Sequence, residues 1–103
     1  PAPDPRSRHA LHLYTVLVDR ERSGVSRDEF LDAMTRRNIG AGVHYLGIPE
    51  HPYYQERFGW KPKQWPNAMD VGRRTVSLPL SPKLTDQDVA DVVEAVRGIV
   101  SNK

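Results

Sequence analysis

Three short stretches between residues 39 and 80 decide which fold we expect for this chain. Residues 39–45 read Ile-Gly-Ala-Gly-Val-His-Tyr, residues 51–59 read His-Pro-Tyr-Tyr-Gln-Glu-Arg-Phe-Gly, and residues 75–80 read Thr-Val-Ser-Leu-Pro-Leu. The first and third are short apolar or β-branched runs, which are typical of strands. In the second, Pro52 suits the first turn of a helix and Gly59 suits its end. The centre of the chain is therefore predicted to alternate between strand and helix.

The residues on the N-terminal side of this centre predict one strand and one helix. Residues 9–19 form a β-branched and aromatic run with two mostly apolar faces, so we expect a central strand that is covered on both sides. Ser26 and Glu29 have the spacing of a capping box. They open a helix whose buried stripe is expected to be Phe30, Leu31, Ala33 and Met34.

The C-terminal side predicts two more helices. Pro66 can open a short one, and Thr85 can cap the last one. The last helix carries an apolar stripe at helical period, made of Val89, Val92, Val93, Val96, Ile99 and Val100. Because β-branched residues are poor helix formers, packing against a sheet must stabilise this helix.

The complete order β-α-β-α-α-β-α predicts an α+β protein, a small two-layer sandwich with about three strands and helices on the sheet. The 103 residues suffice for one hydrophobic core. Residues 1–8, which contain three prolines, are interpreted as a linker or tail, and residues 9–103 as the domain. The chain does not begin with Met, so we expect a fragment of a longer protein.

Composition argues against several classes of function. The chain has no cysteine, which excludes disulfides and thiolate sites. Its net charge is +2, but the arginines alternate with acidic residues along the sequence, so nucleic-acid binding is not expected. No stretch approaches the roughly 20 apolar residues of a membrane span, and we expect a cytoplasmic protein. The four histidines lack the spacing of a zinc site, and no metal site is predicted.

His44 and Tyr45 are the most interesting polar pair in the sequence. They end a predicted strand and precede a loop, where binding groups are often presented by a rigid element. From position alone, a pair that is hydrogen-bonded locally is the more common outcome. No nucleophile motif or catalytic residue is identified in the chain. The aromatic residues around the following loop could serve packing or could meet another domain; they are Tyr53, Tyr54, Phe58, Trp60 and Trp65.

The ordered series of motifs resembles the C-terminal domain of the DegT/DnrJ/StrS-type aminotransferases. The motifs are Arg27-Asp28-Glu29 at a helix start, His44-Tyr45 at a strand end, Pro52-Tyr53-Tyr54 in a helix, Ser77-Leu78-Pro79-Leu80, and Leu84-Thr85-Asp86 before the valine-rich helix. The resemblance spans about residues 10–100. It implies the small C-terminal domain of a fold-type I aminotransferase.

The resemblance also implies a reaction. Family members use pyridoxal phosphate to transfer an amino group from an amino acid, usually glutamate, to a keto sugar linked to a nucleotide. The lysine that binds the cofactor belongs to a larger upstream domain. This chain would therefore supply no catalytic or cofactor-binding residue, and it would be inactive alone. Its partners would be its own N-terminal large domain and a second subunit of a homodimer.

The same resemblance implies that His44, Tyr45 and His51 bind substrate on the sugar-nucleotide side. Pro49 stands where family members often have a second histidine, and His51, two residues later, could serve instead. Two alternatives stay open. One is a relative without aminotransferase activity, and the other is an independent α+β interaction module with an exposed aromatic loop. Dye binding to an exposed apolar surface would favour the severed domain over the independent module.

Overall fold

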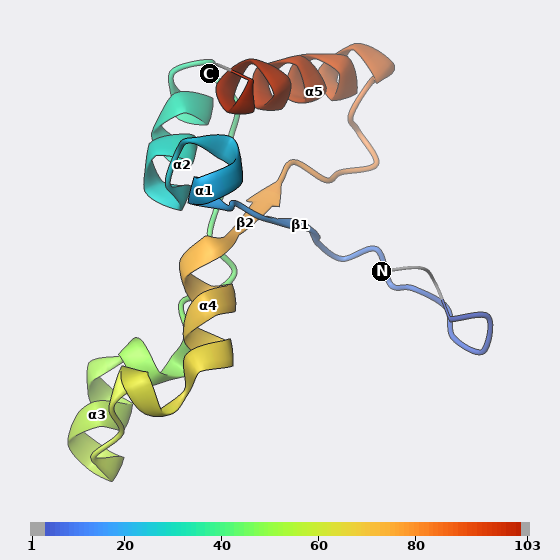
Figure 1. The fold of residues 1–103 in the computed structure, drawn as a ribbon. Coiled ribbons are helices and arrows are strands. Elements are labelled where there is room, and N and C mark those ends of the chain that lie inside the picture. The colour runs from blue at the N-terminus through green and yellow to red at the C-terminus, as the bar shows by residue number, and fades with distance from the viewer. Residues whose placement is uncertain (1–3, 102–103) are drawn as a thin grey trace.

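The computed structural model describes residues 4–101 and has an α+β architecture (Figure 1). The expected class is confirmed, and the expected order of elements is consistent with the structure except that residues 39–45 form one bridge in place of a strand and that a one-turn helix, Arg20–Ser23, is added. The helices and strands are β1 (Tyr14–Leu17), α1 (Arg20–Ser23), α2 (Arg27–Thr35), α3 (Pro52–Phe58), α4 (Pro66–Arg74), β2 (Thr75–Leu78) and α5 (Asp86–Val100). Two short 3-10 turns, η1 (Ile48–Glu50) and η2 (Pro62–Gln64), flank α3.

The sheet has two antiparallel strands, β1 and β2, with Tyr14 opposite Leu78 and Leu17 opposite Thr75. The third strand expected over residues 39–45 is wrong. This segment contributes a single bridge, in which the backbones of Gly42 and Ser77 exchange hydrogen bonds of 2.8 and 3.1 Å. Glycine in a strand has no side chain to pack and weakens the ladder, and this segment has glycine at two of its seven positions.

The covered strand is β2 rather than β1. Thr75, Val76 and Ser77 are buried, whereas Tyr14 is 58% and Leu17 is 47% exposed. The expectation that the first strand would be central and covered on both sides is therefore wrong. The reason is position in the sheet, because β2 lies between β1 and the bridge at Gly42, while β1 has β2 as its partner on one edge.

Helices α2 and α5 pack with β2 to form the hydrophobic core. Phe30, Met34 and Val76 are its fully buried members, and Val18, Ala33, Ala95 and Ile99 complete it. The predicted capping box at Ser26 and the predicted cap at Thr85 are confirmed, and the cap at Thr85 is also a capping box. The hydroxyl of Ser26 accepts from the backbone N–H of Glu29 at 3.3 Å, and that of Thr85 accepts from Asp88 at 3.2 Å.

The apolar stripe of α5 divides into two parts. Ile99 is buried, and Val92, Val96 and Val100 pack against the core. Val89 and Val93 remain 50% and 41% exposed, so only part of the predicted stripe packs against the rest of the chain. Val89 and Val93 instead line an apolar groove that α5 shares with residues of both strands.

The molecule is elongated and consists of two parts (Figure 1). We call the first the core lobe (β1, β2, α1, α2 and α5) and the second the arm (η1, α3, η2 and α4). Helix α4 runs away from the sheet, and α3 lies at its far end. The radius of gyration is 16.0 Å, whereas a compact domain of this length has about 13 Å.

Residues 4–12 precede the core lobe and are exposed. They include most of the segment interpreted as a linker or tail; residues 1–3, like 102 and 103 at the other end of the domain, lie outside the described residues. Among residues 4–101, no helix is both long enough and apolar enough to cross a membrane.

Candidate functional site

The loop that follows the bridge at Gly42 carries the predicted site residues. His44, Tyr45 and Leu46 are exposed, Tyr45 by 73%. The peptide bond between His44 and Tyr45 is cis. Their rings meet edge to face with centroids 5.1 Å apart. The pair is thus held together while both rings stay open to the surroundings.

Two glycines fix this loop against α4. A Cβ atom added at Gly72 would lie only 2.6 Å from the backbone nitrogen of Gly47, which is closer than real Cβ contacts. A Cβ added at Gly47 would lie 3.1 Å from the carbonyl oxygen of Ala68. The loop backbone can therefore approach the helix only because neither position has a side chain.

Polar contacts add to this attachment. The guanidinium of Arg73 on α4 donates to Glu50 at 3.0 Å, and the side-chain amide of Gln55 donates to the carbonyl of Pro49 at 3.0 Å. Pro49 itself is buried. The loop from Gly47 to Glu50 is thus part of the arm, and it moves with α4 if α4 moves.

His51 lies at the start of α3, after η1, and is exposed. Its ring contacts Tyr54 edge to face, with centroids 6.5 Å apart. Within residues 4–101, no ring contact or hydrogen bond joins His51 to His44 or Tyr45. The structure therefore brings two of the three predicted residues together and presents the third from the neighbouring helix.

The aromatic residues of the arm form one cluster. Tyr54 stacks on Phe58 at 6.0 Å and on Trp60 at 5.5 Å, and Trp60 lies 5.0 Å from Trp65. Tyr53 remains 63% exposed, Phe58 55% and Trp65 43%. The cluster stabilises the tip of the arm by ring contacts and still exposes a large aromatic area.

The described residues offer no ready metal centre. Between residues 4 and 101, no three side chains of the types that bind metal ions converge on one point. The lowered carboxylate pKa values belong to groups with local hydrogen-bond donors. The pKa of Glu29 is lowered first by the backbone N–H of Ser26 and then by its hydroxyl, and Asp88 has the same arrangement with Thr85. These shifts mark helix caps and not a reactive site.

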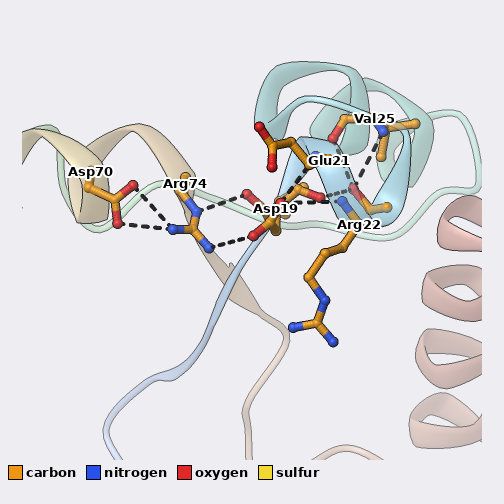
Figure 2. Close-up of polar contacts among 8 residues, drawn as sticks. Asp19, Glu21, Arg22, Val25, Asp70 and Arg74 are labelled. Atoms are coloured by element: carbon orange, nitrogen blue, oxygen red, sulfur yellow. Dashed lines mark hydrogen bonds and ion pairs between the residues drawn. The ribbon is translucent and has the colours of Figure 1, made fainter.

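The polar junction between the arm and the core lobe was not predicted from the sequence. Arg74, the last residue of α4, binds Asp70 on its own helix and Asp19, which lies between β1 and α1 (Figure 2). The spacing of Asp70 and Arg74 is the i,i+4 pattern of helix ion pairs, which the sequence displays. Asp19 lies 55 residues away, and no sequence signal points to it.

A second surface feature is an apolar groove of about 540 Å³ on the core lobe, between the first turns of α5 and the end of the sheet. Its rim includes Arg97 and Ser81, and the rest of its lining is apolar. The apolar residues are Tyr14, Val16, Leu78, Pro79, Leu80, Leu84, Val89, Val92, Val93 and Val96.

Comparison with known proteins gives a consistent result. The model of the DegT/DnrJ/EryC1/StrS aminotransferase family matches residues 1–97. The spore coat polysaccharide biosynthesis protein SpsC of Bacillus subtilis (strain 168) is 51% identical over 94 residues, which are 90% of this chain and 24% of that protein. The uncharacterized protein MJ1066 of Methanocaldococcus jannaschii is 45% identical over 94 residues, 91% of this chain and 24% of that protein.

Two solved structures have a similar fold. They are the apo-form and the PMP-form of the putative sugar aminotransferase Spr1654 from Streptococcus pneumoniae. Each superimposes with a TM-score of 0.76 at 26% identity and covers 87% of this chain and 22% of that chain. The chain thus spans about a quarter of the length of the curated relatives it matches.

Proposed function

The chain belongs to the DegT/DnrJ/EryC1/StrS aminotransferase family, and from that membership we propose that it is the small C-terminal domain of a pyridoxal-phosphate-dependent aminotransferase of sugar biosynthesis. The observation that carries this proposal is the family match over residues 1–97, together with 51% identity to a polysaccharide biosynthesis protein. Residues 9–103 form the domain in this proposal. A larger domain, which makes up most of the relatives' length, holds the cofactor.

The proposed reaction moves an amino group from an amino acid, with glutamate as the first candidate, to a keto sugar linked to a nucleotide. Pyridoxal phosphate carries the amino group between the two substrates. The lysine that binds the cofactor belongs to the larger domain, so this chain alone is inactive. The PMP-form of the similar Spr1654 structure supports the choice of cofactor. The enzyme is proposed to act in the cytoplasm as a homodimer.

Within this chain, His44, Tyr45 and His51 are the proposed substrate-binding residues. Imidazole and phenol groups can donate and accept hydrogen bonds, which suits sugar hydroxyls and phosphate oxygens. The exposure of all three side chains supports the assignment. So does the fixed backbone of the loop, because a binding group on a well-positioned loop loses less freedom when it meets its ligand.

The visible absorption spectrum of the full-length polypeptide tests the proposal. The protein is purified with pyridoxal phosphate, and spectra are recorded before and after glutamate is added. We expect the band of the bound cofactor to fade as the amino group is taken up. Nucleotide-linked keto sugars are then added one at a time, and an amino sugar product is sought by mass spectrometry.

Each result of this experiment has a clear meaning. A cofactor band that responds to glutamate, followed by an amino sugar, establishes the aminotransferase and its substrate. A full-length protein that binds no pyridoxal phosphate contradicts the proposal and favours a non-catalytic relative. If the band responds to a different amino acid, that amino acid replaces glutamate as the donor, and the rest of the proposal stays intact.

A further inference from the structure

The arm is joined to the core lobe by few covalent connections. The chain crosses between the two parts at residues 43–46 and again where α4 ends at Arg74 and β2 begins at Thr75. Figure 1 shows α4 leaving the sheet at a steep angle with α3 at its distant end. The contacts at the base of α4 therefore help to determine the direction in which the arm points.

Arg74 makes the most extensive of these contacts (Figure 2). Its Nη1 donates to both carboxylate oxygens of Asp70 at 3.0 and 3.1 Å, and its Nη2 donates to Oδ2 of Asp19 at 3.3 Å. Its Nε lies 3.4 Å from the carbonyl oxygen of Val18. One guanidinium thus connects the last turn of α4 with the end of β1.

Asp19 extends the connection to a third element. Its other oxygen, Oδ1, accepts from the backbone N–H groups of Glu21 and Arg22 and so caps α1. The backbone also joins at this point, because the N–H of Val18 donates to the carbonyl of Arg74 at 2.9 Å. Arginine is suited to this role because its planar group carries five donors in a fixed geometry, whereas lysine can place only one ammonium.

Arg27 makes a second contact across the same junction. Its Nη1 donates to the carbonyl oxygen of Gly72 on α4 at 3.3 Å, and its side chain is 13% exposed. Arg73, the neighbour of Arg74, differs in this respect. It pairs with Glu50, which belongs to the arm, so its ion pair does not reach the core lobe. Adjacent arginines on α4 therefore have separable roles.

We propose that Arg74 is a positioning residue, which fixes the direction of the arm on the core lobe and thereby holds the loop that follows Tyr45, and His51, in the arrangement that binds substrate. The loop follows α4 because Gly47 and Gly72 are in backbone contact. The substrate part of this inference rests on the proposed function. The direction of the arm does not, because it depends only on the contacts described above.

The effect on substrate affinity depends on the fraction of the protein that is in the binding-competent arrangement. A protein whose binding-competent arrangement is only a fraction f of the whole has an apparent dissociation constant raised by 1/f. Saturating substrate restores that arrangement, so the rate at saturation changes little. If loss of the Arg74 contacts reduces f to about a tenth, KM for the keto sugar rises about tenfold and kcat falls less than about twofold.

Kinetics of the full-length enzyme test this split. Arg74→Met removes every contact of the guanidinium, and it is expected to raise KM for the keto sugar without a comparable loss of kcat. Arg74→Lys keeps the charge and one contact, so it should restore part of the wild-type KM. Arg36→Met is the control for KM, because it removes one exposed arginine charge at the end of α2 in the core lobe, and it should leave KM within about twofold of the wild-type value.

A distance measurement tests the direction of the arm without relying on activity. Spin labels are attached to cysteines introduced at Glu56 on α3 and Glu94 on α5, both of which are exposed. Pulsed electron resonance on the full-length protein then gives the distribution of distances between arm and core lobe. We expect a broader distribution for Arg74→Met and an unchanged one for Arg73→Met.

The two measurements separate the outcomes. A broader distribution together with a raised KM supports the proposal. An unchanged distribution overturns it, as does an equally broad distribution for Arg73→Met, because the loss of a positive charge on α4 would then be the cause. A broader distribution with an unchanged KM overturns the inference that the direction of the arm affects substrate binding. A wild-type enzyme that aminates no sugar refutes the proposed function, while the distances still decide the role of Arg74.

A milder variant guards against loss of folding. Asp19→Asn removes the charge that faces Arg74 but keeps a side chain that is a good helix cap, so α1 should persist. Its distribution of distances is expected to lie between those of the wild type and Arg74→Met. A distribution equal to that of the wild type in both Asp19→Asn and Arg74→Lys would also count against the proposal.

Discussion

At the scale of single residues, the contact between Gly47 and Gly72 is the most demanding in the arm. The sequence contains seven glycines, and nothing in their spacing distinguishes this pair. The structure does so, because a Cβ at Gly72 would meet the backbone of Gly47 at 2.6 and 3.0 Å. Backbone atoms cannot move aside as a flexible side chain can, so the loop and the helix would have to separate.

Gly72→Ala is therefore expected to destabilise the chain by about 1–3 kcal/mol, as overpacked sites do. Gly40→Ala is the matched control, because a Cβ there would meet nothing within 4 Å. It should change the free energy of unfolding by less than about 0.5 kcal/mol or stabilise slightly. Urea denaturation of the 103-residue chain measures both. Equal free energies of unfolding for Gly72→Ala and Gly40→Ala would contradict the close contact between Gly47 and Gly72.

Substitutions of His44 and Tyr45 should change KM for one substrate more than KM for the other. In the full-length enzyme, His44→Ala and Tyr45→Phe are each expected to raise KM for the keto sugar by about tenfold, the loss of roughly one hydrogen bond, and to leave KM for the amino donor nearly unchanged. His12→Ala, an exposed histidine before β1, serves as the control. Steady-state kinetics with each substrate varied in turn provides the measurement.

The opposite result would remove this pair from the binding site. If both variants kept the wild-type KM for the sugar, the pair would have the local structural role that its position alone made more common. If KM for the amino donor rose instead, the loop would face the other substrate. The structure is compatible with a binding role because both rings are exposed.

At the scale of the elements, the helices followed from local signals, whereas the pairing and burial of the strands did not. The caps at Ser26 and Thr85, the start at Pro52 and the end at Gly59 all operate within a few residues, so the sequence contains the whole cause. Helix α1 was missed because it is one turn long, although Asp19 caps it and Gly24 closes it with a φ of 76°.

The strands depend on neighbours that are distant in sequence. Residues 39–45 have an apolar pattern, yet they form one bridge, because strand pairing requires a partner in register. For the same reason the pattern could not tell which strand would be covered. Both faces of residues 9–19 are mostly apolar, but β1 became the exposed strand and β2 the buried one.

The cap of α5 gives a prediction about pH. Hydrogen bonds from the backbone N–H of Thr85 and then from its hydroxyl lower the pKa of Asp88 in the folded chain. The unfolded chain then takes up the proton first as the pH falls. The stabilisation from this carboxylate is thus present above the ordinary aspartate pKa of about 4, and it is lost as the pH falls through the lower folded value.

Asp88→Asn should remove this dependence. The variant is expected to be less stable than the wild type at pH 7 and to lose less stability between about pH 5 and pH 2. Thr85→Ser keeps the capping box and should retain the wild-type dependence. Thermal unfolding of the 103-residue chain, followed by circular dichroism, measures both. If the melting temperatures of Asp88→Asn and the wild type fell in parallel with pH, the stabilising role of the Asp88 carboxylate would be contradicted.

At the scale of the whole molecule, the chain leaves much apolar surface open. The apolar groove between α5 and the sheet contains Val89 and Val93, and the tip of the arm contains exposed aromatic rings. Large exposed apolar patches usually mark interaction surfaces. The elongated shape has the same implication, because a radius of gyration of 16.0 Å leaves less surface covered than a compact domain would.

The 103-residue chain is therefore expected to bind a dye that fluoresces on apolar surfaces. Replacing both Val89 and Val93 by Lys should reduce the fluorescence at least about twofold, because two charges in the groove oppose binding. Lysines at Gln87 on α5 and at Ser101, which follows α5, add the same charge outside the groove and should leave the fluorescence unchanged. A wild-type chain that binds no dye would favour an independent module over a severed domain.

The sequence alone determined the class of the fold, the helices other than α1, and the family, because these depend on local periodicity, caps and an ordered series of motifs. Only the tertiary structure decided which strand is buried, that Gly47 lies on Gly72, and that Arg74 reaches Asp19. Each of these contacts joins residues more than 20 positions apart in the chain. Their geometry results from how the core lobe and the arm pack together, and the order of residues along the chain does not show which distant residues this packing brings into contact.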